Sequence, residues 1–145
     1  MTPPVLKNIR NFATIINQQP RTNMDKKTIE EVIKGEVERG NFSVEGIAAK
    51  LFITPFTFRR QFERLFHESP KKYLHRARMN KAKQLLREHP ETTIETIAHT
   101  LGYTDKSNFN RAFRTAFGIT PSEFRAQCET TRINNNQKNQ EYETI

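Results

Sequence analysis

The sequence predicts an all-α protein built from two similar halves. Apolar residues recur at the three- and four-residue spacing of amphipathic helices along most of the 145 residues, and no segment has the alternation of a half-buried strand. Serine, threonine and proline stand where these helices would begin. The pattern of the middle of the chain returns about 50 residues later, which predicts one supersecondary unit occurring twice.

Residues 1–24 are predicted to form an amphipathic helix and a linker. Apolar residues at helical spacing over Pro4 to Asn17 predict the helix, whose apolar face would pack on this domain or mediate dimerisation with a second subunit. From Asp25 the pattern is helical again, and Gly40 is well suited to end that helix.

Two capped helices follow in the first half. Ser43 is a good N-cap for a short helix, and Thr54 with Pro55 opens a longer one that ends near Phe66. On the longer helix one face carries phenylalanines and the opposite face carries arginines. The first predicted unit therefore spans about residues 43–66.

A long helix is predicted from about 70 to 88, starting at Ser69 and Pro70. It has two apolar stripes, which indicate packing on two sides. The first stripe contains Tyr73, Leu74, Ala77 and Leu85, and the second contains Met79, Ala82 and Leu86.

The second half has the same order of elements. Thr93 caps a short helix, Gly102 makes a turn, and a longer helix runs from Asp105 to Phe117, so the second unit spans about residues 93–117. A last short helix is predicted from Thr120-Pro121 to about Gln127. Residues 129–145 are rich in Asn, Gln, Thr and Glu and are predicted to be a disordered tail.

The two halves align residue by residue with one insertion. Each half has a short helix, a tight turn and a longer helix with an aromatic inner face, which is the layout of a helix-turn-helix. At a spacing of 50 the matching pairs are Ser43/Thr93, Ile47/Ile97, Ala48/Ala98, Leu51/Leu101 and Thr54/Thr104; at 51 they are Phe58/Phe109, Arg60/Arg111, Phe62/Phe113, Phe66/Phe117 and Tyr73/Phe124.

Residues 97–125 read I-A-H-T-L-G-Y-T-D-K-S-N-F-N-R-A-F-R-T-A-F-G-I-T-P-S-E-F-R. This segment, within two helix-turn-helix units joined by a long helix, resembles the DNA-binding domain of the AraC/XylS family of transcriptional regulators. The resemblance covers about residues 25–128. It implies two homeodomain-like three-helix subdomains on a connecting helix, each placing a recognition helix in successive major-groove segments of double-stranded DNA. It also implies transcription activation through RNA polymerase, with one monomer on the DNA.

The candidate DNA contacts lie on the outer faces of the two longer helices and on the connecting helix. Arginine suits guanine, asparagine suits adenine, and an aromatic ring suits a thymine methyl group. The predicted base contacts are Phe56, Arg59, Arg60, Lys106, Ser107, Asn108, Asn110 and Arg111. Residues 54–83 hold nine basic and two acidic residues, which predicts phosphate contacts there. The predicted phosphate contacts are Arg64, Lys71, Lys72, Arg76, Arg78 and Arg114.

Composition agrees with a polyanionic partner. The net charge is +8 and the pI is near 9.9, which favours nucleic acid first and an anionic membrane surface second. Cys128 is the single cysteine, so no internal disulfide forms and a reducing cytoplasm is favoured. No apolar run approaches the roughly 18 residues of a membrane span, and no signal peptide is evident.

No enzyme, cofactor or metal site is predicted. The four histidines have no ligand spacing with Cys128 or with carboxylates, and the chain has no phosphate-binding glycine loop. Two alternatives to DNA binding stay open, namely a helical module that docks an acidic protein on its basic face and a binder of structured RNA.

One position departs from the family pattern. Phe52 stands where the second unit has Gly102, and a bulky residue resists the positive φ that glycine adopts at a helix end. The first turn therefore has a different geometry, or Phe52 is strained, or packing of its ring offsets the difference.

Overall fold

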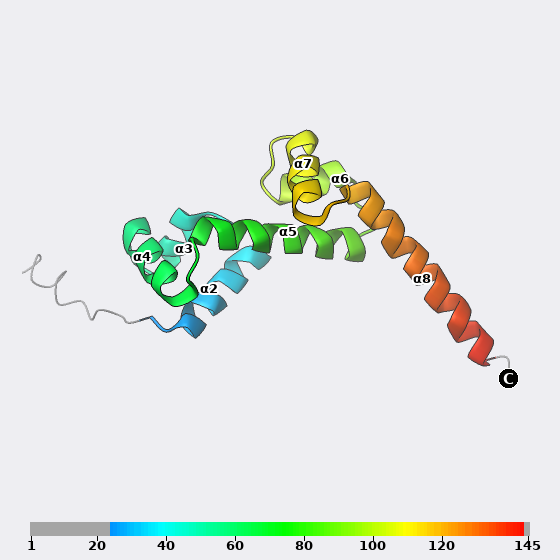
Figure 1. The fold of residues 1–145 in the computed structure, drawn as a ribbon, viewed down its shortest axis with the longest axis horizontal. Coiled ribbons are helices and arrows are strands. Elements are labelled where there is room, and N and C mark those ends of the chain that lie inside the picture. The colour runs from blue at the N-terminus through cyan, green and yellow to red at the C-terminus, as the bar shows by residue number, and fades with distance from the viewer. Residues whose placement is uncertain (1–23, 144–145) are drawn as a thin grey trace, which may run out of the picture.

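A computed structural model describes residues 24–143, and over that range the chain forms seven helices and no strand (Figure 1). The helices are α2 (Lys26–Glu38), α3 (Val44–Lys50), α4 (Pro55–Phe66), α5 (Pro70–Glu88), α6 (Ile94–Thr100), α7 (Lys106–Phe117) and α8 (Pro121–Glu143). The all-α prediction is confirmed. The helix predicted over Pro4 to Asn17 lies outside the described residues.

The helices begin at the caps that the sequence predicts. Side-chain oxygens accept hydrogen bonds from the backbone N–H three residues on, which satisfies a donor that the helix leaves unpaired. The capping residues of α2 to α6 are Asp25, Ser43, Thr54, Ser69 and Thr93. α7 differs, because Asp105 rather than the aligned Thr104 is its cap. The inserted residue of the second half lies at this point.

The structure contains two hydrophobic cores joined by α5 (Figure 1). The first core belongs to α2, α3 and α4, which we call the first unit, and consists of Met24, Ile29, Ile33, Ile47, Ala48, Phe58, Phe62 and Leu74. The second core belongs to α6 and α7, which we call the second unit, and consists of Phe42, Met79, Ala82, Leu86, Ile97, Ala98, Leu101, Phe109 and Phe113.

α5 packs on both cores, as its two stripes predict. Leu74 enters the first core, whereas Met79, Ala82 and Leu86 enter the second. Leu85 lies on the same side of α5 as Leu74 but packs against the second core. The stripe divides along the helix because α5 leaves the first unit before it reaches Leu85.

Aromatic residues at equivalent positions anchor α4 and α7. Phe58 and Phe62 of α4 are fully buried, with ring centroids 5.6 Å apart. Phe109 and Phe113 of α7 are buried in the same way, at 5.9 Å. The same inward-facing pair therefore fixes which face of each helix points outward.

Two left-handed residues distinguish the first unit from the second. Phe52 has φ +56° where Gly102 has +84°, and His67 has φ +57° where Gly118 has +78°. The turns are therefore alike in backbone, and the first unit places side chains where glycine is favoured. The Phe52 ring is 91% exposed, so little packing offsets its strain.

We expect Phe52→Gly to stabilise the protein by about 0.5–1 kcal/mol, because relief of a left-handed conformation is worth roughly 1–2 kcal/mol and the added flexibility of glycine returns part of it. Urea unfolding would measure the change. The matched control is Phe56→Gly, which makes the same exchange within the first turn of α4 and should destabilise. Destabilisation by Phe52→Gly would show that the Phe52 side chain contributes more than its strain costs.

The C-terminal part of the described chain differs from its prediction. α8 continues to Glu143, although the sequence predicted a helix to about Gln127 followed by disorder from residue 129. The prediction considered only apolar burial, whereas a hydrogen bond to α5 also holds the extended helix. The Arg132 side chain donates to the carbonyl of Arg87, which the last turn of α5 leaves without a helical partner. Figure 1 shows α8 extending away from both units.

A buried carboxylate holds the loop between α2 and α3. Glu36 is 4% exposed and accepts hydrogen bonds from Arg39 Nη1 and Asn41 Nδ2, both at 2.7 Å. The hydrogen bond from Asn41, with the nearby charge of Lys50, lowers the pKa of Glu36. This residue therefore favours the loop conformation that carries Phe42 into the second core.

The Glu36 carboxylate should stabilise the fold at neutral pH and lose this effect in acid. Its contribution is complete above the ordinary glutamate pKa of about 4.3 and disappears as the pH falls through the lower folded value. The difference in unfolding free energy between wild type and Glu36→Gln should therefore shrink from pH 7 to about pH 3. A difference that stays constant with pH would contradict this prediction.

Candidate nucleic-acid interface

The outer face of α4 carries most of the predicted contacts of the first unit. Phe56, Arg59, Arg60 and Arg64 are all exposed, and Phe56 keeps 69% of its surface accessible. Phe56, Arg60 and Arg64 occupy the side opposite the buried phenylalanines, and Arg59 lies at its flank. Arg59 Nη2 lies 3.9 Å from Glu45 of α3, with both side chains more than half exposed, so this weak pair leaves the guanidinium accessible.

The outer face of α7 holds the second predicted set. Lys106, Ser107, Asn108 and Arg111 are exposed, and Asn110 is half-buried. The side-chain amide of Asn108 donates to Asp105 Oδ2 at 2.9 Å, in addition to the backbone cap. A base contact through the Asn108 amide would have to replace that hydrogen bond. Arg111 and Ser107 are four residues apart and share one side of the helix.

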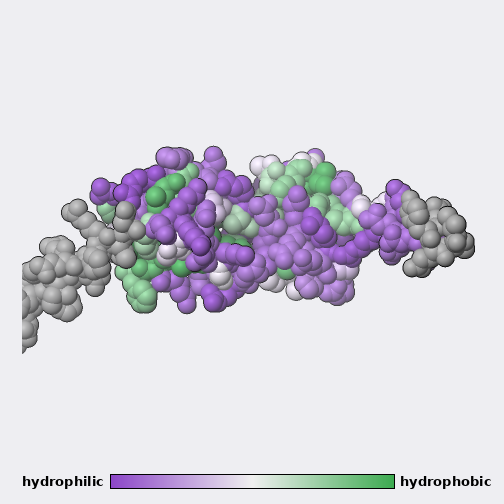
Figure 2. Space-filling model, turned by 90° about the horizontal axis from the view of Figure 1, so that it is seen from below, coloured by the Kyte–Doolittle hydropathy of each residue, from purple (hydrophilic) through white to green (hydrophobic). Residues whose placement is uncertain are grey.

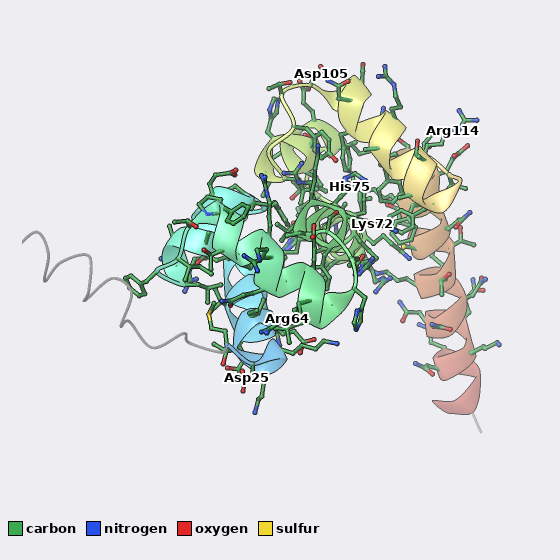
Figure 3. All side chains as sticks on the ribbon, turned by 60° about the vertical axis from the view of Figure 1, so that its left-hand side comes forward. Asp25, Arg64, Lys72, His75, Asp105 and Arg114 are labelled. Atoms are coloured by element: carbon green, nitrogen blue, oxygen red, sulfur yellow. The ribbon has the colours of Figure 1, made fainter. Side chains whose placement is uncertain are left out.

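Basic side chains from three helices follow one line in the view of Figure 3. Arg64 of α4, Lys72 of α5 and Arg114 of α7 lie in that order across the picture, with His75 next to Lys72. Lys72, His75 and Arg114 are exposed. In this view the basic side chains of α5 thus lie between those of α4 and α7.

A cavity of about 530 Å³ opens between α3, α4 and the beginning of α5. Its polar lining includes Arg59, Lys71, His75 and Arg78, together with Glu45 and Glu63. Cationic groups from α4 and α5 thus converge there beside two carboxylates. Figure 2 shows that hydrophilic residues cover most of one face of the molecule, while hydrophobic residues form separate patches.

Arg76 is engaged within the protein. Its guanidinium donates to both carboxylate oxygens of Glu68, at 3.0 and 2.6 Å, and lies 5.2 Å from the centre of the Tyr73 ring. These hydrogen bonds lower the pKa of Glu68 and raise that of Arg76. A bidentate pair of this kind competes with a phosphate for the same N–H groups. The assignment of Arg76 as a phosphate contact therefore has a structural competitor.

Arg78 is also held inside the structure. Its guanidinium carbon lies 5.0 Å from the centre of the Phe42 ring and 5.2 Å from that of Tyr103. Its Nε atom is buried and makes no hydrogen bond within residues 24–143. Of the six predicted phosphate contacts, Arg76 and Arg78 thus have evident internal roles.

The described residues offer no support for a metal site. Between residues 24 and 143, no group of three or more His, Cys, Asp and Glu side chains is placed to hold a metal ion. Over the same range no helix is both long and apolar enough to cross a membrane.

A family model for a helix-turn-helix domain matches residues 47–127, more than half of the chain. The chain belongs to the AraC/XylS family of transcriptional regulators. The transcriptional activator RhaS of Escherichia fergusonii is 36% identical over 83 residues, which cover 57% of this chain and 30% of RhaS. The matched part is therefore less than a third of that relative's length.

Solved structures of AraC-type domains share the arrangement. An AraC-type regulator from Chromobacterium violaceum matches with a TM-score of 0.60 and 28% identity, over 69% of this chain and 90% of that one. The DNA-binding domain of AdpA, solved in complex with a target DNA, matches with a TM-score of 0.61 and 27% identity, over 72% of this chain and 95% of that one. These matches confirm the AraC-type fold.

The residues that sequence reasoning missed are those that join the two units of the AraC-type domain. Phe42 stands outside the repeat pattern, and Glu36 looks like an ordinary residue on a charged helix end. The only signal for Phe42 was an aromatic residue in a short loop beside glycine and asparagine. Such a residue reveals its partners only when the tertiary structure is known.

Proposed function

We propose that the protein binds an asymmetric site on double-stranded DNA as a monomer and reads two successive major-groove segments, with α4 in one and α7 in the other. This proposal is supported by the structural equivalence of the two repeated units. Each helix is anchored by an equivalent buried phenylalanine pair and presents arginine and polar side chains outward. In this arrangement the two segments lie on one face of the duplex, about 34 Å apart.

The base contacts come from the outer faces of α4 and α7. The phosphate contacts come from Arg64, from Arg114 and from the basic side chains of α5 between these two helices. Arg60 and Arg111 occupy equivalent positions and are the preferred guanine readers, and Phe56 is suited to a thymine methyl group. Lys71 and Lys72 at the start of α5 are suited to phosphates. The other predicted contacts keep their assignments, with Arg76 the weakest of them, whereas Arg78 is not proposed as a phosphate contact because its guanidinium lies against Phe42 and Tyr103.

Activation of transcription is the regulatory outcome we propose, through contact with RNA polymerase in the cytoplasm. RhaS, which shares the matched region, is named a transcriptional activator. A reporter gene placed downstream of the duplex site that the protein prefers should be transcribed more strongly when the protein is expressed. Repression of that reporter would reverse the sign of the regulation but leave DNA binding intact.

Titration against a library of duplexes at fixed salt tests DNA recognition. A specific site should bind at least about 10³-fold more tightly than unrelated duplexes. Equal affinity for all duplexes, or none, would overturn the proposal. Structured RNA and an acidic protein serve as competitors, and tighter binding of either one would favour the corresponding alternative function.

We expect Lys72→Ala to weaken binding to every duplex alike. Removing one phosphate contact should reduce the slope of log affinity against log salt by about 0.9, because one fewer counterion is released. Fluorescence anisotropy between 50 and 200 mM salt would measure this slope. Arg76→Ala is the matched comparison, and a smaller change is expected there because Glu68 already occupies its guanidinium.

A further inference from the structure

Arg78 lies where the two units meet. Phe42 precedes α3 in the first unit, and Tyr103 lies in the turn between α6 and α7 of the second unit. The Arg78 guanidinium, from the middle of α5, contacts both rings, at 5.0 and 5.2 Å. A planar cation close to two aromatic rings is favoured electrostatically by both of them.

The loop that carries Phe42 packs on the second unit. Phe42 is 8% exposed and is a member of the second core, although it precedes α3 in sequence. A Cβ atom on Gly40 would lie 3.4 Å from the carbonyl oxygen of Thr100, so the loop passes close to the end of α6. The first unit therefore touches the second directly, as well as through α5.

The Arg78 side chain also reaches the turn before α7. A Cβ atom on Gly102 would lie 4.0 Å from Arg78 Nη2. This turn leads through Tyr103 to Asp105, the cap of α7. One side chain thus contacts the loop of the first unit and the segment that aims the outward helix of the second.

The geometry points to Arg78 as a positioning residue that fixes the orientation of α4 relative to α7, and through it the spacing between DNA segments that the protein accepts. The Nε atom of Arg78 is buried and lacks a hydrogen bond in the described chain, so the contacts of this side chain with the two rings are not directed by a polar partner at Nε. The part about DNA spacing rests on the proposed function. The part about orientation does not.

The DNA experiment compares duplexes whose two half-sites are separated by the selected spacing or by one base pair more or fewer. One base pair turns the second half-site by about 34–36°, so wild type should lose at least about tenfold in affinity for either altered spacing. Arg78→Met keeps the length of the side chain without its planar charge and should reduce this loss below about threefold. Base preference within each half-site should be unchanged.

Three further variants make the result specific. Arg78→Lys keeps the positive charge and should retain a spacing preference between those of wild type and Arg78→Met. If the Arg78 side chain acted only by filling space, Arg78→Met would preserve the preference as well as Arg78→Lys does. Phe42→Leu removes one ring but keeps an apolar side chain, and should act in the same direction as Arg78→Met. Arg87→Met removes an equal charge from the exposed end of α5 and should keep the wild-type preference.

A measurement without DNA separates the two parts of the inference. Spin labels at Ala49→Cys of α3 and Thr115→Cys of α7, in a Cys128→Ser background, report the distance between the units; both labelled positions are exposed. Arg78→Met should broaden or shift the distance distribution, with helical content unchanged. An unchanged distribution together with an unchanged spacing preference overturns the inference. A changed distribution in a protein that prefers no duplex overturns the proposed function and leaves the role of Arg78 in orientation standing.

Discussion

Phe113→Ala is expected to lower the free energy of unfolding by about 3–5 kcal/mol, because truncating a buried aromatic side chain removes its burial and leaves a cavity. Phe113 has no exposed surface, and its ring centre lies 5.9, 4.7 and 5.8 Å from those of Phe109, Phe117 and Phe124. A loss of this size is a large fraction of the 5–15 kcal/mol typical of a domain. Urea unfolding followed by circular dichroism would measure it.

Phe56→Ala is the matched control for that experiment. Phe56 is 69% exposed on α4, so the same exchange should change the unfolding free energy by no more than about 0.5 kcal/mol. The two variants together separate aromatic residues that hold the fold from those that face outward. Comparable losses for both would mean that Phe56 packs more tightly than its exposure indicates.

Arg60→Ala is expected to relax base preference in the segment read by α4. Loss of a bidentate contact to guanine should cost about 1–3 kcal/mol on the preferred site and little on a site that lacks that guanine. Selection from a randomised library followed by sequencing would locate the relaxed position. The segment read by α7 should keep its preference.

Arg111→Ala is the counterpart in the second unit and should relax the other segment. If Arg60→Ala weakened all duplexes alike while Lys72→Ala relaxed base preference, base and phosphate contacts would have been assigned to the wrong residues. If neither arginine variant changed base preference, Arg60 and Arg111 would not be the residues that contact the bases, and the contacts would come from other residues on the outer faces of α4 and α7.

The sequence was sufficient for α2 to α7, the repeat and the inner faces because those features depend on local signals. Caps such as Ser43 and Thr93 bind a backbone N–H three residues away, and the four-residue spacing of Phe58 and Phe62 predicts the buried face of α4. The left-handed backbone at Phe52 resolved one of the stated alternatives. The turn has the same form as that at Gly102, and the side chain is strained and unpacked.

Local signals of this kind do not predict contacts between residues that are distant in sequence. Arg78 looks like one more cation in a basic stretch, and only the folded chain shows it between Phe42 and Tyr103. The bond from Arg132 to the carbonyl of Arg87 likewise joins residues 45 positions apart. The number of lysines and arginines in residues 54–83 predicts a basic region. Tertiary contacts decide which of these side chains stabilise the fold and which face outward.

The sharing of α5 between both cores limits how the duplicated halves can be recombined. A chimera that joins the first half of one protein to the second half of another, with its junction between residues 67 and 93 but outside residues 75–78, would place a foreign helix surface against one of the two cores. Leu74 would have to remain with the first half, and Met79 and Leu86 with the second. The halves are thus repeats in sequence but not interchangeable modules, and an exchange of DNA specificity is better made by grafting the outer faces of α4 and α7 alone.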